Sequence, residues 1–79
     1  MSETSQLISF GEIVRQLRQE KGWSQEELAS QCDLDRTYVS GVERGVRNIG
    51  LLNILRIADA LSIKASALLE FHHPTGGKP

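Results

Sequence analysis

The 79-residue sequence has a single cysteine, two prolines and few aromatic residues, which make up 5% of the chain. Because Cys32 cannot form an internal disulfide, we expect it to be a reduced, buried thiol in a cytoplasmic protein. No apolar run reaches the ~18 residues that a membrane-spanning helix needs, and no charged-then-apolar secretion signal opens the chain. The sequence therefore predicts one small cytoplasmic domain without a membrane segment.

An excess of positive charge is also missing, since the net charge is −1 and the pI is about 6.1. This balance argues against a protein that coats polyanions non-specifically. A specific DNA-binding protein needs favourable charge only on the face that touches DNA. Between Asp35 and Asn48 three arginines stand against two carboxylates, a local charge of +1, while the rest of the chain carries −2. This asymmetry favours the segment 35–48 as the face that meets DNA.

Residues suited to catalysis or metal binding are scarce as well. His72 and His73 are adjacent in a tail rich in proline and glycine, with no carboxylate or thiol at ligand spacing. The run Gly76-Gly77-Lys78 lacks the strand and the following helix of a phosphate-binding loop. No nucleophile lies at a spacing that would pair it with a base. We therefore predict no enzyme activity, no metal site and no cofactor.

The chain is rich in helix signals instead. Residues 9–12 have the S-x-x-E form of a capping box, so we expect the first helix to begin at Ser9. The apolar residues that follow have the spacing of an amphipathic helix: Phe10, Ile13, Val14 and Leu17. Gly22 is expected to end this helix in the left-handed conformation. Residues 24–27 repeat the capping box and predict a second helix that runs through Cys32.

Three further helices are predicted. Asp35 is the expected N-cap of a third helix, which ends at Gly45. A fourth helix covers residues 51–61, and a fifth covers residues 64–70. The fourth has these residues on its apolar side: Leu51, Ile54, Leu55, Ala58 and Leu61. The chain is thus expected to be all-α, with residues 1–8 a partly disordered arm, 9–71 the domain and 72–79 a disordered tail.

The third helix has two different faces. Val39 and Val42 lie together on one face, and the opposite face is polar or open: Arg36, Thr37, Ser40, Gly41 and Arg44. Arginine can make a bidentate contact to guanine, and threonine can touch a thymine methyl. Glycine is unfavourable inside a helix, and Gly41 would let the helix approach DNA closely. The alternative is that these residues are merely solvated.

A short helix, a tight turn and a helix with an exposed polar N-terminus make a helix-turn-helix. The run GEIVRQLRQEKGWSQEELASQCDLDRTYVSGVERGVRN, continued by NILRIADALSIKASALL, resembles the phage-repressor and Cro-type (XRE-type) helix-turn-helix family. Within that family it is most similar to the controller proteins of restriction–modification systems. The resemblance implies a five-helix, lambda-repressor-like DNA-binding domain. It also implies a bacterial or phage-encoded transcriptional regulator, cytoplasmic and nucleoid-associated, that acts as activator and autorepressor.

The family's pattern assigns roles to individual residues. It implies base contacts from Arg36 and Thr37, with Ser40 one turn later. It implies DNA backbone contacts from the start of the second helix and from the residues at and after the end of the third: Ser24, Gln25, Arg44, Arg47 and Asn48. Helix capping alone explains Ser24. Tyr38 falls at the edge of the packed face, where its ring can pack while its hydroxyl reaches a phosphate. The alternative is plain core packing.

Two features concern the support of the third helix. Glu43 falls on its packed side, and the family pairs this glutamate with an arginine late in the first helix, here Arg18. We therefore expect a partly buried Arg18–Glu43 ion pair. Asp33 stands where many members have glycine at the turn, and aspartate tolerates the left-handed conformation at modest cost.

The resemblance also implies partners. Family members are two-fold dimers that bind half-sites about one helical turn apart. The surplus apolar residues can form the partner surface or close the domain's own core: Leu52, Ile63, Leu69 and Phe71. Glu26 and Glu27 form an acidic spot that in this family can touch RNA polymerase, although helix N-termini favour acidic residues anyway. The alternative function is a protein-interaction module of the same fold, such as an antitoxin or adaptor.

Overall fold

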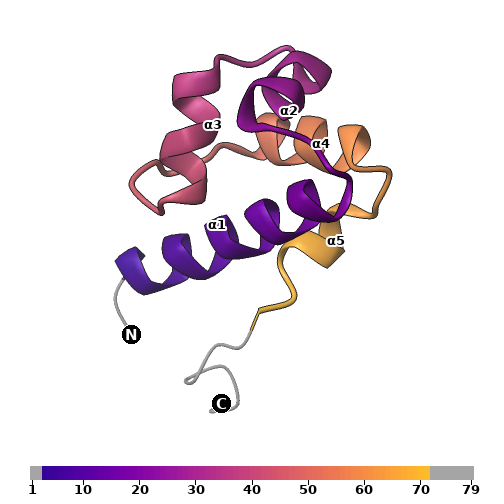
Figure 1. The fold of residues 1–79 in the computed structure, drawn as a ribbon. Coiled ribbons are helices and arrows are strands. Elements are labelled where there is room, and N and C mark those ends of the chain that lie inside the picture. Colours follow the sequence, from indigo (N-terminus) through magenta and orange to yellow (C-terminus); the bar gives the residue numbers. More distant parts are fainter. Residues whose placement is uncertain (1–2, 72–79) are drawn as a thin grey trace.

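The structure is a computed structural model that describes residues 3–71, and within this range the chain forms five helices and no strand (Figure 1). The helices are α1 (Glu3–Glu20), α2 (Gln25–Cys32), α3 (Arg36–Glu43), α4 (Leu51–Ala60) and α5 (Ala65–Leu68). The predicted all-α, five-helix architecture is confirmed. The tail predicted over 72–79 lies outside the described residues.

Helix α1 begins earlier than predicted, at Glu3, so that Ser9 lies inside the helix. The predicted capping box at Ser9 is therefore wrong, and residues 3–8 are helical where we expected an arm. The reason is tertiary packing. Ile8 lies against Gly45, in the loop after α3, and Leu7 is half-buried. These contacts stabilise a helix start that local sequence signals do not mark.

The end of α1 and the start of α2 follow the sequence signals. Gly22 has φ +75°, the N–H of Gly22 donates to the carbonyl of Gln19, and the N–H of Trp23 donates to the carbonyl of Arg18. This pair of hydrogen bonds is the Schellman ending that glycine favours. Ser24 is the N-cap of α2, and its Oγ accepts from the N–H of Glu27 at 3.0 Å. Both predicted boundaries are confirmed.

The turn between α2 and α3 is built on Asp33, which has φ 60° and ψ 43°. The N–H of Leu34 donates to the carbonyl of Ala29 at 2.8 Å, so the chain reverses within a few residues. The prediction of a left-handed aspartate is confirmed. Asp35 occupies the N-cap position of α3, but its side chain makes no capping hydrogen bond. The boundary was therefore predicted correctly and the capping role was not.

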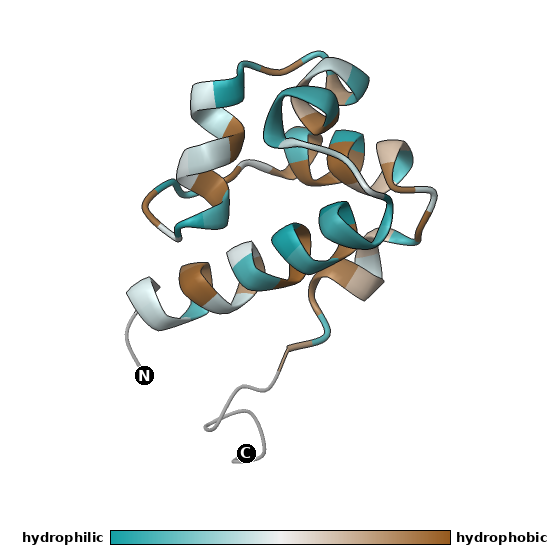
Figure 2. Ribbon diagram, viewed as in Figure 1, coloured by the Kyte–Doolittle hydropathy of each residue, from teal (hydrophilic) through white to brown (hydrophobic). Residues whose placement is uncertain are grey.

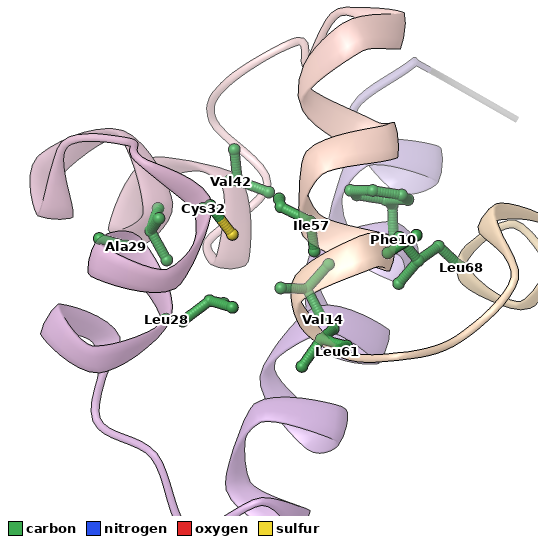
Figure 3. Packing of buried hydrophobic residues seen from close by; sticks show 11 residues of the cluster. Phe10, Val14, Leu28, Ala29, Cys32, Val42, Ile57, Leu61 and Leu68 are labelled. Carbon is green, nitrogen blue, oxygen red and sulfur yellow. The ribbon is translucent and has the colours of Figure 1, made fainter.

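All five helices contribute to one core, and the longer helices carry both polar and apolar residues (Figure 2). Figure 3 shows buried side chains of the different helices pointing toward one another. The core consists of Phe10, Val14, Leu28, Ala29, Cys32, Val39, Val42, Ile57, Ala58, Leu61 and Leu68. The predicted buried thiol is confirmed, and burial raises the pKa of Cys32 to about 11, against a smaller lowering by Arg56.

Helix α4 corrects one expectation. Its buried face is formed by Ile57, Ala58 and Leu61, with Ile54 half-buried, whereas Leu51 and Leu55 are 68% and 45% exposed. The predicted apolar side was therefore wrong for these two leucines. Leu51 is the first residue of the helix and extends past the core, and Ile57 occupies the core position instead. Helix α5 is shorter than predicted, but Leu68 anchors it in the core.

Candidate nucleic-acid interface

Helix α3 packs against α1 and α2 and leaves its opposite face open (Figure 1). Val39 and Val42 are fully buried, as predicted. On the other side Arg36 and Thr37 are exposed at the N-terminal end of the helix, and Ser40 is partly exposed. The structure thus brings the three predicted base-contacting side chains together on one accessible, polar face.

Gly41 serves a different purpose from the one predicted. It is buried, and a Cβ at this position would lie 2.7 Å from Cγ of Arg47. The space that glycine leaves is therefore filled by the arginine side chain, and the prediction that it allows a close approach of DNA was wrong. The guanidinium of Arg47 continues over the ring of Tyr38, with Cζ 5.2 Å from the ring centroid. Arg47 is thereby held across α3, while much of its side chain remains exposed.

Tyr38 is half-buried, and its ring packs against the core as expected. Its hydroxyl accepts a hydrogen bond from Nδ2 of Asn53 at 3.1 Å. Sequence reasoning missed Asn53. The signal was present, because Asn53 is a polar residue flanked on both sides by apolar residues in the sequence LLNIL at the start of α4.

The predicted Arg18–Glu43 ion pair is confirmed. Nε of Arg18 donates to Oε2 of Glu43 at 2.7 Å, and Nη2 donates to Oε1 at 3.0 Å. Nη1 donates to the carbonyl of Trp23 at 2.8 Å. Both side chains are buried, and within residues 3–71 no buried polar side-chain atom lacks a hydrogen-bond partner. The pair ties the C-terminal end of α3 to α1.

Gln25 joins the same network, since its Nε2 donates to Oε1 of Glu43 at 3.0 Å. The first residue of α2 is therefore bonded to Glu43 and, through this carboxylate, linked to Arg18. One amide hydrogen of Gln25 is used inside the protein, and the second is the one that could serve an external group. The network thus fixes the N-terminus of α2 relative to α3.

The backbones of α1 and α3 approach closely at Gly11. A Cβ at this position would lie 2.5 Å from the carbonyl oxygen of Glu43 and would also clash with the carbonyl of Val42. Only glycine leaves room for this contact. Gly11 therefore sets how closely α1 supports the C-terminal end of α3.

The other predicted site residues divide into two groups. Ser24, Arg44 and Asn48 are exposed, and so are Glu26 and Glu27 in the first turn of α2. Of the four candidate dimer residues, Leu52 and Leu69 are 71% and 52% exposed. Ile63 and Phe71 are partly buried and pack against the domain's own core, which was the other role expected for them.

Other kinds of site find little support in the described part of the chain. Within residues 3–71 no three His, Cys, Asp or Glu side chains are grouped so that they could hold a metal ion. His72 and His73 lie outside these residues. No helix in this range is long and apolar enough to cross a membrane.

Comparison with known proteins agrees with this geometry. Residues 14–68 match the helix-turn-helix family HTH_3. The chain is 52% identical over 65 residues to the control protein C.BamHI of Bacillus amyloliquefaciens, covering 81% of this chain and 80% of that protein. Its fold is similar to that of the restriction–modification controller protein C.AhdI from Aeromonas hydrophila, with a TM-score of 0.80 and 53% identity over 81% of this chain and 97% of that one.

A second solved structure is the tetramer of the controller protein C.Esp1396I in complex with its natural 35 base-pair operator. It has a TM-score of 0.73 and 36% identity, covering 81% of this chain and 84% of that chain. The family match runs from the middle of α1 to the end of α5 and includes the whole α2–α3 unit. The chain therefore belongs to the XRE-type helix-turn-helix family of DNA-binding transcription regulators, which are not enzymes.

Proposed function

We propose that this protein is the controller of a restriction–modification system, a homodimer that binds an inverted-repeat operator and regulates transcription. The observation that carries the proposal is the exposed polar end of α3, where Arg36 and Thr37 stand on a helix held by the buried Arg18–Glu43 pair. A helix presented in this way can enter a major groove with its N-terminal side chains foremost. The similarity to a controller solved on its operator supports the same use here.

Within this proposal Arg36 and Thr37 contact base edges, and Ser40 does so one turn later. Arg36 is exposed, and two of its guanidinium N–H groups can donate to guanine O6 and N7. Phosphates are bound from both sides of the recognition helix α3. The residues proposed to hold them are Ser24, Gln25, Tyr38, Arg44, Arg47 and Asn48. For Gln25 the hydrogen not given to Glu43 makes the contact.

Dimerisation is proposed to use the exposed apolar side of α4. Leu51, Leu52 and Leu55 are all more than two-fifths exposed, and Leu69 near the end of α5 is exposed as well. Such neighbouring leucines are unfavourable in water, and burying them against a second copy removes that cost. A dimer also doubles the phosphate contacts of a chain whose net charge is −1.

The proposal extends to two further assignments. Glu26 and Glu27, exposed in the first turn of α2, form an acidic surface through which a DNA-bound dimer touches RNA polymerase and activates transcription. The place of action is the bacterial cytoplasm, on the nucleoid. Binding at a second site nearby represses the protein's own gene.

Selection of bound duplexes from a random-sequence DNA pool tests the function. We expect an inverted repeat with half-sites about one helical turn apart. If six to eight phosphates are neutralised, the logarithm of affinity should fall with the logarithm of salt concentration with a slope of about −5 to −7. A folded protein that selects no motif and shows a slope near zero would refute the proposal and favour the interaction-module alternative.

A further inference from the structure

We propose that Asn53 is a positioning residue for DNA binding, which turns the hydroxyl of Tyr38 into a hydrogen-bond donor for a phosphate next to Arg47. The inference rests on the proposed function and adds a residue to the same site. It follows from three contacts that join α3, the loop after it and the first turn of α4: the Asn53–Tyr38 hydrogen bond, the Arg47–Tyr38 stacking and the seat of Arg47 on Gly41.

The direction of the Asn53–Tyr38 hydrogen bond decides the argument. Nδ2 of Asn53 can only donate, so the hydroxyl oxygen of Tyr38 is the acceptor at 3.1 Å. A phenol has one hydrogen, and this hydrogen must then point away from Asn53. Within residues 3–71 Asn53 is the one hydrogen-bond partner recorded for this hydroxyl. The hydroxyl is therefore left to donate to a group from outside the chain.

Arg47 supplies the positive charge beside that donor. Its aliphatic part occupies the space left by Gly41, and its guanidinium lies 5.2 Å from the centre of the Tyr38 ring. Stacking on an aromatic face restricts the guanidinium without using its N–H groups, which remain free to donate. A neutral donor and a cation are thus presented together, a combination suited to a phosphate oxygen pair.

The amide of Asn53 is suited to this task for chemical reasons. An apolar side chain at position 53 would let the hydroxyl rotate and exchange its hydrogen bonds with water. A carboxylate would accept the hydroxyl hydrogen and turn the donor inward. A hydroxyl that already accepts an N–H bond is also a stronger donor, because hydrogen bonds in a chain polarise one another. Asn53 therefore makes the donor available before DNA arrives.

A double-mutant cycle on the selected operator duplex tests the proposal. We expect Tyr38→Phe to weaken binding about tenfold, since it removes one hydrogen bond to a charged group. Asn53→Ala should weaken binding about fivefold. The double variant should bind within about twofold of Tyr38→Phe alone, because without the hydroxyl there is nothing for Asn53 to orient. Gln19→Ala, which removes an exposed amide on α1, is the control and should bind like the wild type.

The cycle separates positioning from a merely structural role. If Asn53 only stabilised α4, its replacement would weaken binding equally in both backgrounds, and the double variant would lose about fiftyfold. That result, or an Asn53→Ala variant with wild-type affinity, would overturn the inference while leaving the proposed function intact. A folded wild-type protein that binds no duplex would refute both. Thermal melting of each variant establishes that the affinities are those of folded protein.

Discussion

Glu43 and Arg18, which lie 25 residues apart in the sequence, form a two-point ion pair in the interior, with N–O distances of 2.7 and 3.0 Å. The guanidinium also donates to the carbonyl of Trp23, and the carboxylate accepts from Gln25. The two charges can be buried here because each buried nitrogen and oxygen atom of the two side chains has a hydrogen-bond partner. The pair fixes the C-terminal end of the recognition helix, so its loss affects both stability and DNA binding.

Replacing Glu43 by alanine should leave the Arg18 charge buried and uncompensated. We expect a loss of ~3–5 kcal/mol in the free energy of unfolding. In a domain of this size the melting temperature should fall by more than about 12 °C. Glu12→Ala removes an exposed carboxylate of α1 and should leave the melt nearly unchanged. The paired change Arg18→Met with Glu43→Leu should recover most of the loss, and an unaltered melt of Glu43→Ala would refute the role of the pair.

Gly11→Ala should separate α1 from α3. The added methyl group meets the backbone carbonyls of Val42 and Glu43, which cannot rotate away. We expect a loss of ~1–3 kcal/mol or more, and weaker DNA binding because the recognition helix shifts. Gly50→Ala is the matched control, since a Cβ there meets nothing within 4 Å. Equal melting temperatures for the two variants would contradict the close contact.

Arg36→Ala and Arg44→Ala should weaken DNA binding in different ways. Loss of a base contact at Arg36 should cost ~1–3 kcal/mol and relax the selected sequence at one position of each half-site. Loss of a phosphate contact at Arg44 should weaken binding to all sequences about equally and reduce the salt slope by about 1 per half-site. Selection and salt titration of both variants distinguish these outcomes, and an unchanged motif with Arg36→Ala would remove this residue from base recognition.

Leu52→Glu should prevent dimerisation without unfolding the domain, because the side chain is 71% exposed in one copy. In a two-fold dimer the substitution buries two unpaired carboxylates, one from each copy, and the burial of each is unfavourable. Sedimentation of the wild type should show a dimer and that of the variant a monomer. Val46→Glu, at an apolar position 64% exposed in the loop after α3, should remain dimeric. A Leu52→Glu variant that still sediments as a dimer would place the interface elsewhere.

The free energy of unfolding should depend on pH through the thiol of Cys32. Burial raises the pKa of its thiol from 9.0 to about 11, so the folded protein holds this proton more tightly than the unfolded chain. The contribution to stability is therefore complete below pH 9 and is lost as the pH rises toward 11. The difference in unfolding free energy between wild type and Cys32→Ala should shrink over this interval. A difference independent of pH would show that the thiol titrates normally.

Local sequence signals predicted much of this fold. Ser24, Gly22 and Asp33 mark boundaries through backbone conformations and capping hydrogen bonds that involve only a few neighbouring residues. Such signals do not depend on the rest of the chain. The start of α1 was missed for the opposite reason, because Ile8 is held by Gly45, far away in the sequence. A capping motif at Ser9 cannot compete with that contact.

In the candidate site, too, features set within one helix were predicted from the residues, and contacts between elements were not. The helical spacing of Val39 and Val42 correctly predicted which side of α3 is buried, and therefore that Arg36 and Thr37 face outward. The Arg18–Glu43 pair was expected from the family resemblance and could not have come from spacing along one helix. The partner of Tyr38 and the occupant of the space at Gly41 were missed. Both Asn53 and Arg47 come from outside α3. A helical wheel shows only the residues of one helix, so it could not reveal either contact.

The contact between Ile8 and Gly45 places the first turns of α1 beside the loop that leaves the recognition helix (Figure 1). This start of the helix is consequently a natural place for a reporter. A small environment-sensitive dye attached in the first turn of α1, for example at Thr4, would sit one turn from the Ile8–Gly45 contact, near the loop that carries the proposed phosphate-binding residues Arg47 and Asn48. Its emission would then follow operator occupancy in real time, without any label on the DNA.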